Sequence, residues 1–128
     1  MAQKEFDIIV YGASGFTGRL VAEYLTQRGI QGWAMAGRNT AKLAAIRDEI
    51  GAPKNTQLIE SDAENTSSLN AMCKRTRSVL TTVGPYQLYG TPLVAACAAS
   101  GTDYLDLNGE PAWARQMIDA HQETAKKS

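Results

Sequence analysis

Short apolar runs alternate with amphipathic segments along the chain. The apolar runs predict five strands, at 6–11, 33–36, 57–61, 78–83 and 103–107. Between and after them, apolar residues recur every three to four positions, which predicts five helices. Because there is no internal repeat and no low-complexity linker, this alternation indicates an α/β fold in which helices cover both faces of a parallel sheet.

Several residues mark where the later helices begin and end. Thr91 is predicted to cap the fourth helix, with Pro92 at its first position and Gly101 as its stop. A last helix is predicted to begin near Pro111. Its inner side is expected to carry Trp113, Met117 and Ile118.

Three glycines at G-x-x-G-x-x-G spacing join the first strand to the first helix. A strand that turns through glycines into a helix gathers free N–H groups at the positive end of the helix dipole, which suits a phosphate. We expect Gly12 to permit the tight turn, Gly15 to let a pyrophosphate approach, and Gly18 to let the helix pack closely. The alternative is a turn that serves helix packing only. The same predicted phosphate-binding turn includes Ser14, Phe16 and Thr17.

A glycine turn after the first strand favours the doubly wound, Rossmann-like fold with strand order 3-2-1-4-5. The ligand crevice of that fold lies at the carboxyl ends of strands one and four. The loops expected to line this crevice are therefore those after Tyr11, Ala36, Ser61, Val83 and Leu107.

The loop after the second strand bears on the choice of cofactor. An NAD site usually offers a carboxylate to the ribose 2′-hydroxyl about 20 residues past the glycines. Here Gly37 is followed by Arg38, and the loop holds no acid. A guanidinium can grip a 2′-phosphate, so we predict NADP(H) in preference to NAD, with Arg38 as the discriminating residue. The alternative is that Arg38 is an ordinary solvated charge near a helix start.

Two further loops supply candidate cofactor contacts. Asp62, just past the third strand, is placed either to accept from the adenine amino group or to cap the following turn. Past the fourth strand, Gly84, Pro85 and Tyr86 are predicted to line the crevice near the nicotinamide-side ribose. For Tyr86, simple packing is the competing interpretation.

Composition narrows the class of protein. The 128 residues fit one domain, and 13 basic against 13 acidic residues give no electrostatic support for binding nucleic acid or an anionic membrane. No apolar run has the length of a membrane span, and no secretion signal opens the chain. Cys73 and Cys97 lack metal-ligand spacing and are expected to be reduced core residues, so we predict a cytoplasmic protein without a metal site.

The sequence does not identify a catalytic residue. No tyrosine is followed by lysine four positions later, so the proton-donating pair of short-chain dehydrogenases is absent from the sequence. His121 stands alone late in the last helix and is predicted to be a surface or packing residue. Asp106 and Glu110 could face the crevice as acids, or could fix their loop through hydrogen bonds to backbone amides.

Several motifs resemble the saccharopine dehydrogenase-like oxidoreductases, in particular the branch that contains the trans-acting enoyl reductases. These motifs are the glycine turn at 12–18, Ala-Gly-Arg at 36–38, Gly-Pro-Tyr at 84–86 and Asp-Leu-Asn-Gly-Glu at 106–110. The resemblance covers nearly the whole chain. It implies an NAD(P)-dependent reductase that transfers a hydride to a C=N or C=C bond, without fixing which.

The resemblance also implies that residues 1–128 are the NAD(P)-binding domain of a longer protein, ending before a sixth strand and a substrate domain. We therefore expect the isolated chain to be inactive, and a small-molecule substrate to bind only the full-length parent. An unpaired edge on strand five would favour a homo-oligomer. The competing hypothesis is a non-catalytic module that senses NADP.

Overall fold

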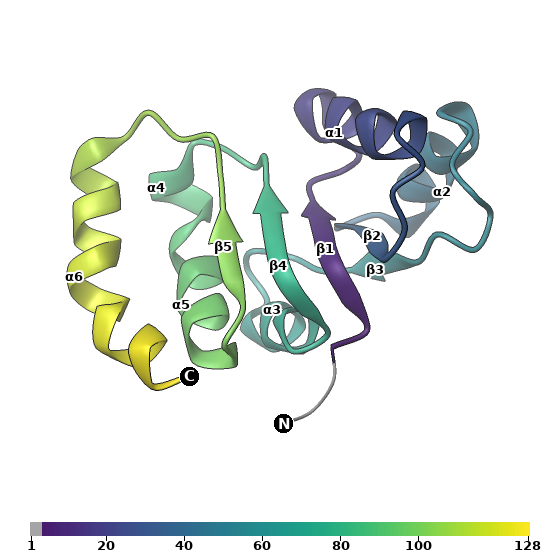
Figure 1. Cartoon of the computed structure of the whole chain (residues 1–128). Coiled ribbons are helices and arrows are strands. Elements are labelled where there is room, and N and C mark those ends of the chain that lie inside the picture. The colour runs from purple at the N-terminus through teal and green to yellow at the C-terminus, as the bar shows by residue number, and fades with distance from the viewer. Residues whose placement is uncertain (1–3) are drawn as a thin grey trace.

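The computed structural model describes residues 4–128. Its strands form one parallel sheet in the order β3-β2-β1-β4-β5, which confirms the predicted doubly wound class. The sheet order places β1 and β4 side by side at the centre, where the chain reverses its winding direction (Figure 1). The strands are β1 (Phe6–Tyr11), β2 (Trp33–Gly37), β3 (Leu58–Glu60), β4 (Thr76–Thr81) and β5 (Asp103–Leu105).

Helices cover both faces of the sheet (Figure 1). On one face, α1 and α2 pack their apolar sides on β1 and β2 around Val10, Met35 and Leu43. On the other face, α3 and α5 enclose a second core with Ile9 and Val79. The helices are α1 (Phe16–Gln27), α2 (Thr40–Glu49), α3 (Thr66–Cys73), α4 (Tyr86–Tyr89), α5 (Thr91–Ser100) and α6 (Pro111–Lys127).

Side-chain caps and a glycine fix one end of each of three helices. The Asn39 side chain accepts from Lys42 N at 3.1 Å to cap α2, and Asn65 accepts from Ser68 N at 3.1 Å to cap α3. Gly101 ends α5 in the left-handed conformation with φ +65°, as its position in the sequence predicts.

The structure corrects several predicted boundaries. β4 begins at Thr76 and ends at Thr81, and β5 is limited to three residues. After β4 and the loop 82–85, the chain forms the short helix α4, which the sequence analysis missed. Gly90 then takes the N-cap position of α5, so Thr91 is a helical residue and not the cap.

The last helix packs against α5 and runs parallel to it (Figure 1). Trp113 is its buried anchor, and Met117 is half-buried, as predicted. Ile118 lines the groove between α6, α5 and β5, so it lies on the predicted side of the helix, but it is 51% exposed and not buried. Across residues 4–128, no helix is both long and apolar enough to cross a bilayer.

The glycine turn brings α1 unusually close to the end of β1. A Cβ at Gly18 would collide with the carbonyl oxygen of Gly12 and lie 2.9 Å from the Cα of Ala13. Gly12 itself has φ +85°, and a Cβ there would meet Val83 Cγ2 at 2.6 Å. The predicted roles of Gly12 in turning and Gly18 in close packing are therefore confirmed.

We expect Gly18→Ala to lower the free energy of unfolding by about 3 kcal/mol, because the new methyl group meets backbone atoms that cannot move aside. Gly109→Ala is the matched control, since no atom lies within 4 Å of the position a Cβ would take there. Urea titration of both variants measures the effect. Equal stabilities would contradict the packing role of Gly18.

Candidate functional site

A cavity of about 440 Å³ opens at the carboxyl ends of the central strands, where the fold predicts the ligand crevice. Its volume falls in the range common for small-molecule sites, about 300–1,000 Å³. Three predicted site residues, Gly18, Pro85 and Tyr86, do not line it. The predicted residues that do are Gly12, Ser14, Gly15, Phe16, Thr17, Gly37, Arg38, Asp62 and Gly84.

The first turn of α1 forms one wall of the cavity. Gly15 is the N-cap of this helix, no side chain caps it, and no acidic residue lies in the first turn. The leading N–H groups of a helix lack intrahelical acceptors and carry the positive end of its dipole. This wall therefore offers an anion several uncommitted donors, which a phosphate group would satisfy.

Arg38 stands at the end of β2, beside this anion-binding wall. Its side chain is exposed, and within residues 4–128 its guanidinium takes part in no ion pair. Gly37 precedes it in the lining, with the Leu43 side chain 3.6 Å from the place of a Cβ. The Arg38 guanidinium therefore keeps its positive charge free for a ligand. Together with the free N–H groups of α1, it makes this end of the cavity favourable for anions.

A further part of the lining carries two acids, in the loop between β3 and α3. Asp62, Ala63 and Glu64 all line the cavity. Asp62 Oδ1 accepts from Glu64 N at 3.0 Å, and Asp62 N donates to Ser68 Oγ at 3.0 Å. The turn-capping role proposed for Asp62 is thus confirmed. Its contact with adenine stays a prediction.

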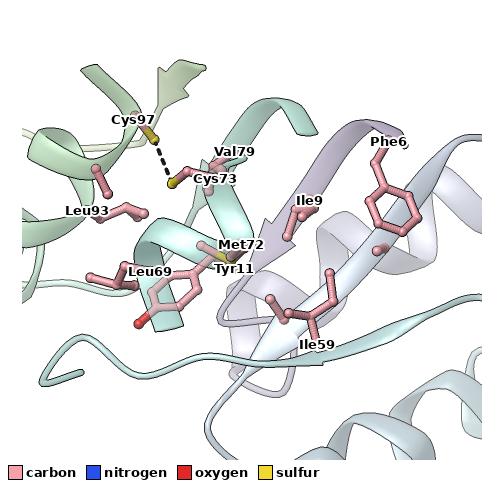
Figure 2. Packing of buried hydrophobic residues seen from close by; sticks show 13 residues of the cluster. Phe6, Ile9, Tyr11, Ile59, Leu69, Met72, Cys73, Val79, Leu93 and Cys97 are labelled. Atoms are coloured by element: carbon pink, nitrogen blue, oxygen red, sulfur yellow. Dashed lines mark hydrogen bonds between the residues drawn. The ribbon is translucent and has the colours of Figure 1, made fainter. Parts of the chain in front are cut away.

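Tyr11 is a lining residue that the sequence analysis did not assign to the site. It is the last residue of β1, only 3% exposed, and it packs near Leu69 and Met72 on the α3 side of the sheet (Figure 2). Burial, followed by the charge of Asp62, raises the pKa of its phenol to about 12. The hydroxyl is therefore neutral at physiological pH. The sequence offered one signal for this residue, since Tyr11 ends the apolar run directly before the glycine turn.

The loop after β4 forms the remaining wall, with Thr82, Val83 and Gly84. Tyr89, at the end of α4, lines the cavity and is 42% exposed. Of the two tyrosines in α4, the one that lines the cavity is thus Tyr89, three residues beyond the one predicted.

Tyr86 has a structural role, as its competing interpretation held. It is 7% exposed and stacks on Trp113, with ring centroids 5.9 Å apart. Its hydroxyl donates to the carbonyl of Thr81 at 3.3 Å and accepts from Leu107 N at 3.3 Å. The side chain therefore ties the ends of β4 and β5 to α6, behind the cavity wall.

The two carboxylates proposed as acids are both committed to hydrogen bonds. Glu110 accepts from Tyr86 N at 2.8 Å and from Gln87 N at 3.0 Å, and so caps the N-terminus of α4. Asp106 accepts from the Tyr104 hydroxyl at 2.7 Å and from the Asn108 side-chain amide at 2.6 Å. Burial and this carboxylate raise the pKa of Tyr104. The loop-fixing interpretation is confirmed for both.

The remaining titratable candidates lie away from this cavity. Cys73 and Cys97 are buried core residues, as predicted. His121 is half-buried and lines a groove between α5, β5 and α6. Within residues 4–128, no three His, Cys, Asp or Glu side chains gather as a metal site.

Fold and cavity together define a dinucleotide-binding domain of the Rossmann class. Residues 8–128 match the family described as saccharopine dehydrogenase NADP binding domain. The chain belongs to this family, whose cofactor is NADP.

Curated relatives carry the same domain within longer proteins. A provisionally named trans-acting enoyl reductase of Mycobacterium tuberculosis is 50% identical over 124 residues, which are 95% of this chain and 30% of that protein. The trans-acting enoyl reductase of Mycobacterium leprae is 48% identical over 125 residues, 96% of this chain and again 30% of the relative. The chain thus spans about 30% of the length of these relatives.

Solved structures share the fold at low sequence identity. Apo saccharopine dehydrogenase (L-Glu forming) from Saccharomyces cerevisiae superposes with a TM-score of 0.66 at 16% identity, covering 88% of this chain and 24% of that one. Citrobacter sp. triphenylmethane reductase complexed with NADP(H) gives a TM-score of 0.65 at 20% identity, covering 95% and 46%. At these identities the likeness establishes the fold.

The cap that Glu110 provides should be measurable. We expect Glu110→Ala to lower the free energy of unfolding by about 1–2 kcal/mol, because two backbone donors of α4 lose their acceptor. Chemical denaturation measures this, with Glu123→Ala as control, since the Glu123 side chain is 77% exposed on α6. If both variants lost the same stability, Glu110 would not be acting as a cap.

Proposed function

We propose that this chain binds NADP(H) in the cavity beside α1 and forms the cofactor-binding part of a reductase. The observation that carries the proposal is the pairing of an uncapped helix N-terminus with an arginine at the end of β2. Both features favour phosphate groups, and the loop after β2 has no carboxylate to accept an unphosphorylated ribose.

Each part of the cavity suits one part of the cofactor. The turn from Gly12 to Thr17 would hold the pyrophosphate through backbone N–H groups. Arg38 would grip the 2′-phosphate, and the free oxygen of Asp62 would accept from the adenine amino group. Gly84 would lie near the nicotinamide-side ribose. Pro85 and Tyr86 would act indirectly, by supporting this loop.

NADPH, when bound, supplies a hydride to the substrate, and the family resemblance points to a C=N or C=C bond. The residues described here serve to bind and orient the cofactor. Asp106 and Glu110 are occupied by loop and helix hydrogen bonds, so neither is free to act as a proton donor. We therefore infer that the substrate site and the proton donor lie in the longer protein, and that the isolated chain is inactive.

The competing hypothesis is an NADP-sensing module without catalysis. Its discriminating test is consumption of NADPH by the full-length parent protein, followed at the absorbance of the reduced nicotinamide with α,β-unsaturated and imine substrates. Turnover supports the reductase. Tight binding without turnover of either substrate class supports the sensor. Cytoplasmic location and the absence of nucleic-acid binding both stay predictions.

The Arg38→Ala variant tests the cofactor assignment. We expect it to weaken NADPH binding by about 10- to 100-fold, because a charge-assisted hydrogen bond contributes about 1.5–3 kcal/mol. NADH has no 2′-phosphate, so its affinity should stay the same. Calorimetric titration of wild type and variant with both cofactors measures the difference.

Arg77→Ala is the matched control for this titration. Arg77 lies near the start of β4, at the opposite end of the sheet from the cavity, and its side chain is 74% exposed. It should bind NADPH like wild type. An Arg38→Ala protein with unchanged NADPH affinity would remove Arg38 from the site, and binding of neither cofactor by the wild type would count against the whole assignment.

We also propose that copies of the chain associate through the β5 edge. Within the described residues, β5 pairs only with β4, and Leu105 at its end and Leu107 just beyond it are 47% and 63% exposed. Light scattering should therefore give the mass of a dimer or larger assembly. Leu105→Lys should lower that mass, while Leu20→Lys, on the exposed side of α1, should not. A wild-type monomer contradicts the proposal.

A further inference from the structure

Two cysteines far from the cofactor cavity face each other across a helix interface. Cys73 is the last residue of α3, and Cys97 lies in the second half of α5. Their sulfur atoms are 3.6 Å apart, and both side chains are almost wholly buried (Figure 2). A disulfide requires an S–S distance of about 2.05 Å, so each sulfur needs to move by less than about 1 Å.

The surroundings of the pair make Cys73 the more acidic of the two thiols. The hydrogen bond from Cys97 and the nearby ammonium of Lys4 lower the pKa of the Cys73 thiol, against the effect of burial. The Lys4 ammonium is held in place by the carbonyl of Cys73 at 3.4 Å and that of Ser100 at 3.2 Å. The pKa of Cys97 is raised by its bond to Cys73 and by burial, so this thiol keeps its proton.

A small oxidant can approach the pair from the Cys97 side. Cys97 lines the groove between α5, β5 and α6, whose volume is about 560 Å³. Part of that groove is bounded by apolar residues of α6, such as Trp113 and Met117. A peroxide molecule in this groove would meet Cys97 first, and the Cys73 sulfur lies 3.6 Å from the Cys97 sulfur.

We propose that Cys73 and Cys97 form a reversible intramolecular disulfide under peroxide. The Cys73 thiolate attacks one peroxide oxygen, the O–O bond breaks, and Cys73 becomes a sulfenic acid with release of hydroxide. The Cys97 sulfur then attacks the sulfur of Cys73, forming the S–S bond and expelling the sulfenic oxygen as water. Hydroxide takes up the proton first lost from Cys73. Two thiols and one peroxide thus become one disulfide and two waters, and a dithiol reductant reverses the change.

The cross-link has a defined structural consequence. It would join the end of α3 to α5 and close the loop that contains β4 and α4. Closing such a loop restricts the unfolded chain, so the oxidised protein should be more stable than the reduced protein. Neither cysteine lines the cofactor cavity, so this inference does not depend on the proposed cofactor site.

Peptide mapping after treatment with hydrogen peroxide tests the proposal on the unmodified protein. Free thiols are blocked in denaturant, and the protein is digested with trypsin without reduction. The expected product is peptide 55–74 linked to peptide 78–115, two hydrogens lighter than the sum of the two. Reduction with dithiothreitol before blocking should return both thiols. Sulfinic or sulfonic acid without a linked pair, or two thiols unchanged, would overturn it.

Thermal unfolding provides a second readout. The oxidised wild type should melt about 5 °C or more above the reduced form, as expected for a short closed loop with some native strain. Cys97→Ala cannot form the bond, so peroxide should give it no such rise. A linked peptide pair without higher thermal stability in the wild type would contradict the predicted location of the cross-link within the folded core.

Discussion

The contact between the first helix and the end of β1 is the constraint on which the rest of this structure depends. A Cβ at position 18 has no room, because it would collide with the carbonyl oxygen of Gly12. The helix can therefore begin directly over the sheet edge only because both positions are glycine. This approach directs the first N–H groups of α1 into the cavity, and the reversal of winding between β1 and β4 opens the cavity beside them.

Charge is divided between the two sides of that cavity. The α1 turn and Arg38 favour anions, while Asp62 and Glu64 stand on the α3 side. A dinucleotide with phosphates at its centre and a neutral, hydrogen-bond-donating amino group on adenine matches this division better than a uniformly charged ligand would. Tyr11 lies between the two sides with a neutral hydroxyl, since burial and Asp62 hold its pKa near 12. It can therefore donate or accept without adding charge.

The sequence predicted the strand order, the family and most of the cofactor cavity, because these depend on local patterns. Alternating apolar runs, caps such as Asn65 and the glycine spacing act within a few residues of their own position. The wrong or missed predictions concern residues whose positions depend on contacts with distant parts of the chain. Tyr86 turns away from the cavity to stack on Trp113, which is 27 residues further along the chain, and Glu110 caps a four-residue helix that has too little length to show periodicity. No local signal distinguishes Tyr86 from Tyr89.

The hydrogen-bonding groups around the cavity suit holding a cofactor more than carrying out a reaction. Asp106 orders its own loop, and Glu110 caps α4. The Glu110 bonds hold the start of α4, next to Gly84, where the nicotinamide end of the proposed cofactor would lie. A carboxylate that left its backbone donors to transfer a proton would leave those donors unpaired and loosen the segment that it holds. These contacts are the reason why we propose that the reacting acid lies outside the described residues.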